Sequence, residues 1–205
     1  MGAAGLNVGT AGNASVRLGD DLQADGLLIT PSGLAADSST PQDMVIVRAD
    51  GRFDGTLAPS SEWQLHRDIY AAFADAGAIL HAHAPFATAL ACQRSDIPPF
   101  HYMIARFGGS TVRCARYATF GTQALSDAAV LALQGRRACL LANHGMVVHG
   151  RNLDHALALA IEFETLCQQY WRTCQIGPPV LLSEEEMADV LERFRWYGKP
   201  VQSSG

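Results

Sequence analysis

The chain has 205 residues, of which 48% are hydrophobic, and it carries 15 Lys or Arg against 20 Asp or Glu. The length suits a single domain, residues 1–205, and the net charge of −5 without a basic cluster argues against nucleic acid and anionic membranes as partners. No apolar run approaches the ~20 residues of a membrane-spanning helix, and five cysteines without a Cys-x-x-Cys pair favour reduced thiols in a cytoplasm.

The first informative stretch, residues 5–15, is rich in glycine and small polar residues and leads into an expected strand at 15–18. It contains neither a P-loop ending nor a Gly-x-Gly-x-x-Gly pattern, so nucleotide binding is not indicated. Two interpretations remain open. The glycines can relieve backbone strain in a bend, or the loop amides can converge on an anion together with the side chains of Thr10 and Asn13.

Short strands are expected next, at residues 26–30 and 44–47. Asp50-Gly51 is a strong hairpin turn signal, with a short return through residues 52–53. Because these segments are close in sequence, the sheet should be at least partly antiparallel. With the helices that follow, the pattern predicts an α/β domain with a mostly antiparallel central sheet flanked by helices.

The first clear helix is expected to begin at Ser60-Ser61 and to end at Gly77 as its C-cap. Ser61 and Gln64 form a capping-box pattern. Glu62 then lies in the first turn, where the helix dipole favours a carboxylate. The paired serines at this helix N-terminus also suit an anion.

A short apolar strand carries His81 and His83. Residues two apart in a strand point to the same face, so both imidazoles project together, as two metal ligands must. A third imidazole, His144, is expected in a turn between two apolar strands. A lone His-x-His pair is more often a strand end near solvent, but with Glu62 the three histidines form a complete ligand set for zinc or a similar divalent ion.

Four further helices are expected, at residues 85–92, 120–133, 152–174 and 183–197. Residues 101–107 are compatible with either a helix or a strand, and a strand is expected at 112–117. The last residues, 201–205, are expected to form a loose tail.

Six blocks of sequence, in this order, give the chain a family resemblance. They are residues 5–17, 30–33, 59–62, 81–83, 117–122 and 143–145. With these blocks the chain resembles the class II aldolase/adducin family over nearly all of its length. The resemblance implies a zinc-dependent lyase on an α/β fold. It also implies a four-fold symmetric homotetramer with active sites at the subunit interfaces.

The resemblance assigns roles to individual residues. His81, His83 and His144 correspond to the ligands of one Zn²⁺ ion per subunit. Glu62 corresponds to a carboxylate that can ligate the free metal and then serve as general acid/base. Tyr102 corresponds to a catalytic tyrosine that is presented to a neighbouring subunit's site.

The resemblance also implies a binding pocket for a phosphorylated sugar. The residues matching the phosphate site are Thr10, Asn13, Ser32, Gly33, Ser60 and Ser61. Phe120 and Tyr197 match aromatic walls near the aldehyde end of the substrate. Ser32 stands where the aldolases usually have Thr. The N-terminal helix that usually precedes residue 5 is almost absent, so the chain is expected to be truncated or to start from a misassigned methionine.

The implied reaction is cleavage of a ketose 1-phosphate, such as L-fuculose 1-phosphate, to dihydroxyacetone phosphate and an aldehyde such as L-lactaldehyde. A 5-deoxy- or 5-methylthio-ribulose 1-phosphate is an alternative substrate. A pentulose-phosphate 4-epimerase of the same family is another alternative. Those enzymes usually have Asp where this chain has Glu62, so the Glu favours an aldolase. Dehydratases and decarboxylases of the family are further alternatives. A non-catalytic adducin-like interaction domain would lose ligands, whereas this chain retains all three histidines and Glu62.

Overall fold

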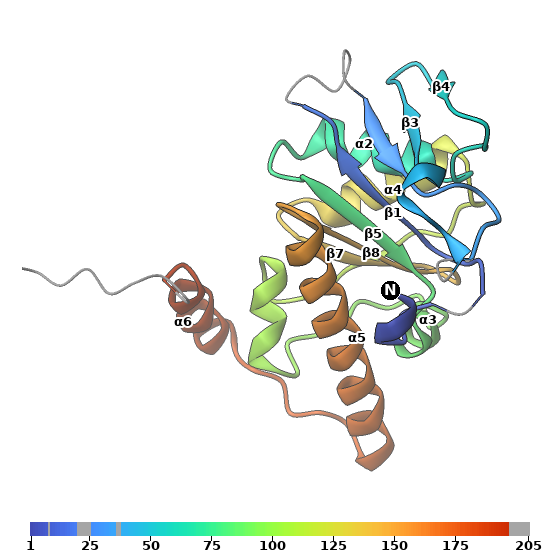
Figure 1. Ribbon diagram of the computed structural model, residues 1–205. Helices are drawn as coiled ribbons and strands as arrows, with labels where there is room; N and C mark the ends of the chain where they lie inside the picture. Colours follow the sequence, from blue (N-terminus) through green and yellow to red (C-terminus); the bar gives the residue numbers. More distant parts are fainter. Residues whose placement is uncertain (8, 20–25, 36–37, 197–205) are drawn as a thin grey trace, which may run out of the picture.

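A computed structural model of the chain describes residues 1–7, 9–19, 26–35 and 38–196. Its centre is one eight-stranded sheet in the order β4-β3-β2-β1-β5-β8-β7-β6 (Figure 1). The strands are β1 (Asn13–Arg17), β2 (Leu27–Ile29), β3 (Val45–Val47), β4 (Phe53–Asp54), β5 (Ala78–Ala82), β6 (Cys114–Ala115), β7 (Ala138–Leu141) and β8 (Gly145–Gly150). Among these strands, β6 and β7 pair in parallel and every other pair is antiparallel. The predicted α/β class with a mostly antiparallel sheet is therefore confirmed.

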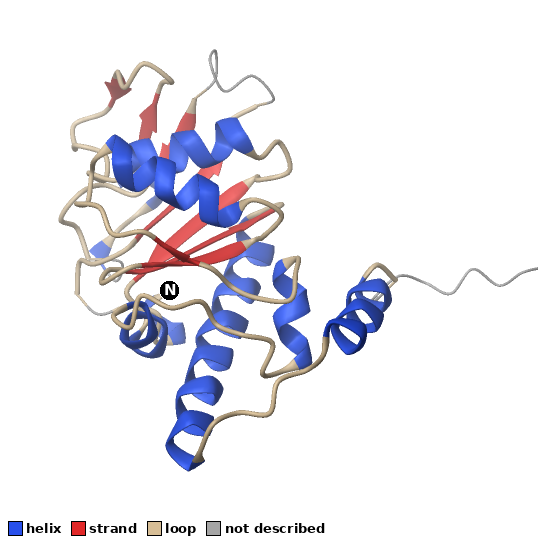
Figure 2. Cartoon of the chain, turned by 180° about the vertical axis from the view of Figure 1, so that it is seen from behind, coloured by secondary structure: helices blue, strands red, loops and turns tan. Residues whose placement is uncertain are grey.

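Helices cover both faces of the sheet (Figures 1 and 2). One face packs against α2 (Trp63–Ala72) and α4 (Gln123–Leu133). The other face packs against α3 (Pro85–Ala91), α5 (Leu153–Ile176) and the 3-10 helix η4 (Tyr102–Phe107). The remaining helical segments are η1 (Gly2–Ala4), η3 (Pro41–Asp43) and α6 (Glu184–Phe194), the last of which lies against η4. None of the helices that the structure describes is long and apolar enough to cross a membrane.

Strand β5 shows how the sheet divides the core. Leu80 belongs to the hydrophobic cluster beside α3 and α5, whereas Ile79 belongs to the cluster beside α2 and α4. Because side chains alternate along a strand, His81 projects to the same face as Ile79. This places the imidazole on the face where α2 begins, and therefore near Glu62.

The start of α2 differs from the prediction. The helix begins at Trp63 with Glu62 as its N-cap residue, and Ser61 makes no capping hydrogen bond there. The reason is a long-range pairing: the Ser60 amide donates to the Thr30 carbonyl at 3.1 Å, which holds this segment extended alongside the end of β2. Glu62 is thus fixed by the sheet and the helix together, and the predicted capping box was wrong.

Gly77 is not a C-cap either, because α2 ends at Ala72 with Phe73 as its C-cap residue. A Cβ atom at Gly77 would lie 2.1 Å from the Arg151 carbonyl oxygen. The glycine is needed for this close approach between the turn before β5 and the turn before α5.

Two further segments can be compared with the prediction. The ambiguous residues 101–107 form η4 over Tyr102–Phe107, and the strand expected at 112–117 is reduced to β6. Tyr197, predicted as an aromatic wall, and the predicted tail at 201–205 lie outside the described residues.

Candidate metal centre and active site

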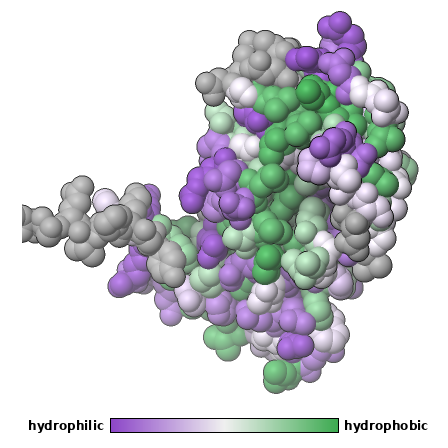
Figure 3. Space-filling view, in the orientation of Figure 1, coloured by the Kyte–Doolittle hydropathy of each residue, from purple (hydrophilic) through white to green (hydrophobic). Residues whose placement is uncertain are grey.

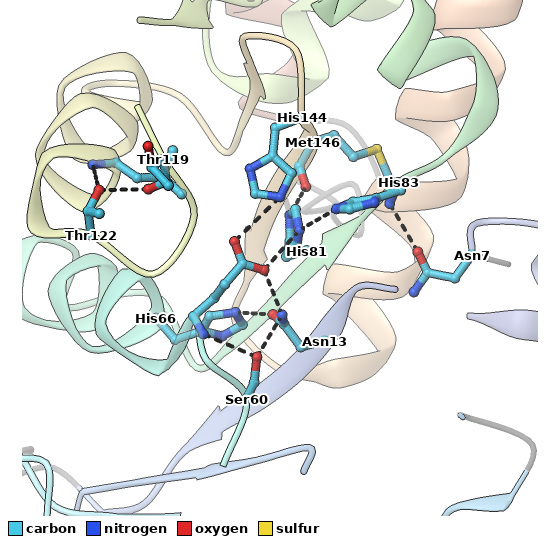
Figure 4. A network of polar contacts seen from close by, with 12 residues as sticks. Asn7, Asn13, Ser60, His66, His81, His83, Thr119, Thr122, His144 and Met146 are labelled. Carbon is cyan, nitrogen blue, oxygen red and sulfur yellow. Dashed lines mark hydrogen bonds and ion pairs between the residues drawn. The ribbon is translucent and has the colours of Figure 1, made fainter. Parts of the chain in front are cut away.

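Three imidazoles meet at the end of the central strands of the sheet (Figure 4). His81 lies on β5, His83 follows directly after this strand, and His144 lies in the turn between β7 and β8. Because β5 pairs with β8, that turn lies beside the end of β5. One ligand nitrogen from each ring lies within 4.8 Å of the others, so the three histidines are a group that could hold a metal ion.

The turn that carries His144 depends on two neighbouring residues. Asn143 has a φ of 53°, in the left-handed region that Asn tolerates better than most residues. A Cβ atom at Gly145 would lie 2.5 Å from the Ala82 carbonyl oxygen and 3.1 Å from Cδ2 of His83. A glycine at 145 therefore lets the turn approach the end of β5 closely enough for His144 to face the other two rings.

His81 is completely buried and held in one tautomer. Its Nδ1 donates to the carbonyl oxygen of Met146 at 3.0 Å. Burial, followed by the nearby His144 and His83 rings, lowers the pKa of His81 well below its ordinary value, so the ring is neutral. Nε2 therefore carries a lone pair, and a metal-binding histidine typically donates its other ring N–H in this way.

Glu62 brings a carboxylate to the same point. Its Oε2 lies 3.2 Å from Nε2 of His81, and its Oε1 lies 3.5 Å from Nε2 of His144. Oε1 is buried and has no hydrogen-bond partner among the described residues. A carboxylate oxygen facing the lone pair of a neutral imidazole needs a cation between them, and the set of three imidazoles and one carboxylate fits a divalent metal ion.

The N-terminal loop supports the histidines from outside. Oδ1 of Asn7 accepts the backbone N–H of His83 at 3.0 Å. Gly12 has a φ of 75°, and a Cβ atom there would lie 2.7 Å from the His81 carbonyl oxygen. Glycine is therefore required where this loop crosses β5. Sequence reasoning did not assign a role to Asn7, although it belongs to the first of the six blocks.

A pocket of about 320 Å³ opens beside the histidines. Its lining includes all six residues predicted to bind phosphate, namely Thr10, Asn13, Ser32, Gly33, Ser60 and Ser61. The bridge between Pro31 and Pro59 holds the loops that carry the last four residues side by side. None of the described lining residues is Lys or Arg, so hydroxyl and amide groups supply the polar surface.

The aromatic residues are placed differently from one another. Phe120 lines the pocket and is 64% exposed, and Tyr117, which the sequence did not single out, lines it as well. Tyr102 is 51% exposed on η4 and is not among the residues lining this pocket. Of the predicted aromatic residues that the structure describes, only Phe120 therefore belongs to the pocket within one chain.

A buried polar network lies behind the pocket and was not predicted (Figure 4). His66 is fully buried, and burial, followed by the nearby His81 ring, lowers its pKa to about 3. Its Nε2 lies 2.6 Å from Oδ1 of Asn13, and its Nδ1 lies 2.7 Å from Oγ of Ser15. Asn13 in turn donates to Ser60 and to Glu62. The sequence gives no signal for this network, because it joins residues 47 to 53 positions apart.

The sequence of this chain is similar to a known family and to several characterised proteins. Residues 1–171 match the family model described as Class II Aldolase and Adducin N-terminal domain. The chain is 53% identical over 198 residues to a 5-methylthioribulose-1-phosphate/5-deoxyribulose-1-phosphate aldolase of Rhodospirillum rubrum, covering 97% of this chain and 87% of the relative. It is 45% identical over 199 residues to an L-fuculose phosphate aldolase of Escherichia coli, covering 97% and 90%.

The fold is also similar to that of a solved structure. A solved structure of an L-fuculose 1-phosphate aldolase superposes with a TM-score of 0.86 at 41% sequence identity. The superposition covers 93% of this chain and 88% of the other. The likeness therefore extends over nearly the whole of the fold.

Proposed function

The chain belongs to the class II aldolase and adducin family and is an aldolase of the fuculose-phosphate and methylthioribulose-phosphate type, and on this premise we propose its substrate and mechanism. The proposed substrate is 5-methylthioribulose 1-phosphate or 5-deoxyribulose 1-phosphate. The 53% identical relative supports this alternative ahead of L-fuculose 1-phosphate, the first expectation from the sequence. L-fuculose 1-phosphate is the second candidate, supported by the 45% identical relative and the solved structure.

The observation that carries this proposal is the position of the metal-binding group at one end of a polar pocket. His83, His144 and Glu62 line the pocket together with the hydroxyl and amide groups predicted to bind phosphate. A ketose 1-phosphate has its carbonyl and its phosphate on neighbouring carbons. One molecule can therefore place its phosphate among the hydroxyl groups and its carbonyl beside the histidines.

His81, His83 and His144, with Glu62, would hold one divalent ion, and we propose that it is Zn²⁺. When bound, such an ion supplies Lewis-acid stabilisation of the negative charge that develops on the ketose oxygen as the carbon–carbon bond breaks. The three imidazoles add no negative charge, so the site keeps a net positive charge even with the Glu62 carboxylate bound.

The proton transfers are assigned to two residues of the protein. Cleavage removes the proton of the hydroxyl group on C4, breaks the bond between C3 and C4, and later returns a proton to C3. We propose that Glu62 moves the proton at C3 and that the phenol of Tyr102 exchanges the proton on the aldehyde oxygen. A positioned proton-transfer group typically contributes 10²–10⁴-fold to the rate.

Binding of the substrate's phosphate group orients the substrate in the pocket. The Ser60 hydroxyl accepts from Asn13 at 2.9 Å and from the Glu62 amide at 3.3 Å, which leaves its own proton free to donate to a phosphate oxygen. We assign Thr10, Ser32 and Ser61 to the same phosphate group. Binding energy from this remote group is then available at the reacting carbon. Phe120 is assigned to the aldehyde end of the substrate.

Tyr102 requires a neighbouring subunit, because it does not line the pocket of its own chain. We propose a homotetramer in which η4 of one subunit completes the site of the next. Exposed apolar side chains on α5 support an interface on this side of the molecule: Leu153 is 47% exposed, Ile161 42% and Ile176 91%. Figure 3 shows hydrophobic residues gathered along the middle of this face.

Subunit mixing tests the shared site. Glu62→Gln and Tyr102→Phe proteins, each inactive, should regain part of the activity when their subunits are exchanged, because some sites then combine two intact residues. Native mass spectrometry confirms that mixed oligomers have formed. No recovery in confirmed mixed oligomers would count against Tyr102 acting across an interface.

The substrate is tested by measuring release of dihydroxyacetone phosphate from three ketose 1-phosphates in parallel. We expect the highest kcat/KM with 5-methylthioribulose or 5-deoxyribulose 1-phosphate, and a lower value with L-fuculose 1-phosphate. The reverse order would make L-fuculose 1-phosphate the substrate. Interconversion of pentulose phosphates without release of a three-carbon product would identify an epimerase and refute the proposed cleavage.

A further inference from the structure

We infer that His66 is a positioning residue, which holds the side-chain amide of Asn13 in one orientation and, through that amide, the carboxylate of Glu62. This inference deepens the proposed function and rests on it for its consequence in catalysis. The orientation itself follows from hydrogen-bond chemistry alone. His66 is 0% exposed, and it lies one helical turn after Glu62 on α2.

The direction of donation along this chain of hydrogen bonds follows from its last acceptor, the carboxylate of Glu62. An ionised carboxylate can only accept, so the Asn13 atom that lies 3.0 Å from Oε2 of Glu62 is the amide nitrogen. The other end of the amide, Oδ1, therefore faces Nε2 of His66 at 2.6 Å. Since Oδ1 can only accept, the proton of the neutral His66 ring is on Nε2.

The same reasoning continues away from the pocket. With its proton on Nε2, His66 has a lone pair on Nδ1, and the Ser15 hydroxyl 2.7 Å away must donate to it. The Ser15 oxygen is then free to accept from the Tyr70 hydroxyl at 2.8 Å. Tyr70 is 1% exposed, and burial raises the pKa of its phenol above the ordinary range, so it retains its proton as the first donor.

This direction matters because Asn13 joins the two halves of the site. Its Nδ2 donates both to Ser60, assigned to the phosphate, and to Glu62, assigned to proton transfer. If the amide turned over, a carbonyl oxygen would face the carboxylate, and the two acceptors would repel each other. His66 opposes that orientation, because its Nε2–H would then face an amide nitrogen, which cannot accept. Turning the amide over would require the Nδ1–H tautomer of His66 and reversal of the bonds to Ser15 and Tyr70.

Two isosteric replacements separate positioning from simple filling of the core. Gln at position 66 carries an amide nitrogen near the place of Nε2 and retains the donor to Asn13. Asn at the same position reaches only as far as Nδ1, so it retains the contact with Ser15 and loses the one with Asn13. His149 provides a control, because it is also buried, at 2% exposed, and its Nε2 bonds to the Arg136 carbonyl away from the pocket.

We expect His66→Asn to lower kcat by about 10–100-fold, the usual cost of losing a group that orients a metal-site side chain. KM should change less, metal content should stay at the wild-type level, and His66→Gln should retain most of kcat. His149→Asn should lower the melting temperature without lowering kcat. Equal loss of kcat in His66→Gln and His66→Asn would overturn the inference.

A measurement on the unmodified, metal-free protein tests the orientation without any assay of activity. In ¹⁵N NMR spectra of the imidazole groups, His66 should have its proton on Nε2 and a bare Nδ1 at neutral pH. The Nδ1–H tautomer would refute the direction of the whole chain. Lack of aldolase activity in the wild-type protein would instead refute the proposed function, while the tautomer result would still decide this inference.

Discussion

Replacement of Glu62 by Gln separates a chemical role of the carboxylate from a structural one. Glu62 is 7% exposed, and it is both the N-cap residue of α2 and a neighbour of two histidines. Gln is nearly isosteric. Its oxygen can accept from Nδ2 of Asn13, which now lies 3.0 Å from Oε2. Its amide nitrogen then takes the place of Oε1, which lies 3.5 Å from Nε2 of His144.

The expected magnitudes differ widely for stability and for rate. Loss of the charge at a helix N-terminus costs about 0.3–1 kcal/mol. Loss of a positioned proton-transfer group costs about two to four decades in rate, or roughly 2.7–5.4 kcal/mol in transition-state stabilisation at 1.36 kcal/mol per decade. Since three histidines remain, Glu62→Gln should keep most of its metal and nearly the whole stability of the fold.

The assay combines kcat for the cleaved ketose phosphate, metal content and chemical denaturation on the same preparation. Glu164→Gln is the matched control, because Glu164 accepts from the amides of Phe86 and Ala87 at 2.8 and 2.9 Å at the start of another helix. It should lose stability and keep its kcat. Near wild-type turnover in a metal-replete Glu62→Gln protein would remove Glu62 from the mechanism, and joint loss of metal and activity would make it chiefly a ligand.

Three further predictions concern the surroundings of the site. Ser61→Ala should raise KM for a phosphorylated ketose and leave KM for its unphosphorylated form nearly unchanged; equal effects on both would place the phosphate elsewhere. Gly145→Ala should cost about 1–3 kcal/mol of unfolding free energy and weaken metal binding, because its Cβ would lie 2.5 Å from the Ala82 carbonyl oxygen; unchanged stability and metal affinity would contradict the close approach. The metal-free protein should lose stability as the pH falls from 6.5 toward 3, because His66 stays neutral in the fold until its pKa of about 3, whereas the unfolded chain takes up a proton near 6.5. Each such histidine contributes a slope of about 1.4 kcal/mol per pH unit, and His66→Gln should reduce the slope measured by denaturation by this amount.

Much of the site could be predicted because its residues follow local rules. The period of two along β5 places His81 and His83 on one face, and the turn between two apolar strands carries His144. The glycine-rich loop and the paired serines indicated a polar anion pocket, and the structure brings these residues together around one cavity. Each of these features depends on a few neighbouring positions in the sequence.

The remaining features depend on contacts between distant segments. The position of Glu62 at the N-cap is set by the pairing of Ser60 with Thr30, which competes with the local capping pattern and overrides it. The role of His66 depends on Asn13, 53 residues earlier in the chain. Helical periodicity identifies His66 only as one residue of a partly buried helix. It contains no information on which polar groups meet its ring.

The central claim is that His81, His83 and His144 hold a divalent ion that the cleavage reaction needs. It is tested most directly by elemental analysis of the purified protein and of His83→Ala, together with release of dihydroxyacetone phosphate before and after chelation. His155→Ala serves as the control, since His155 lies in the first turn of α5 outside the pocket. We predict zinc in the wild-type and control proteins, its loss in His83→Ala, and activity that chelation removes and added Zn²⁺ restores. Full retention of the metal by His83→Ala, or cleavage that is unaffected by complete chelation, would contradict the account.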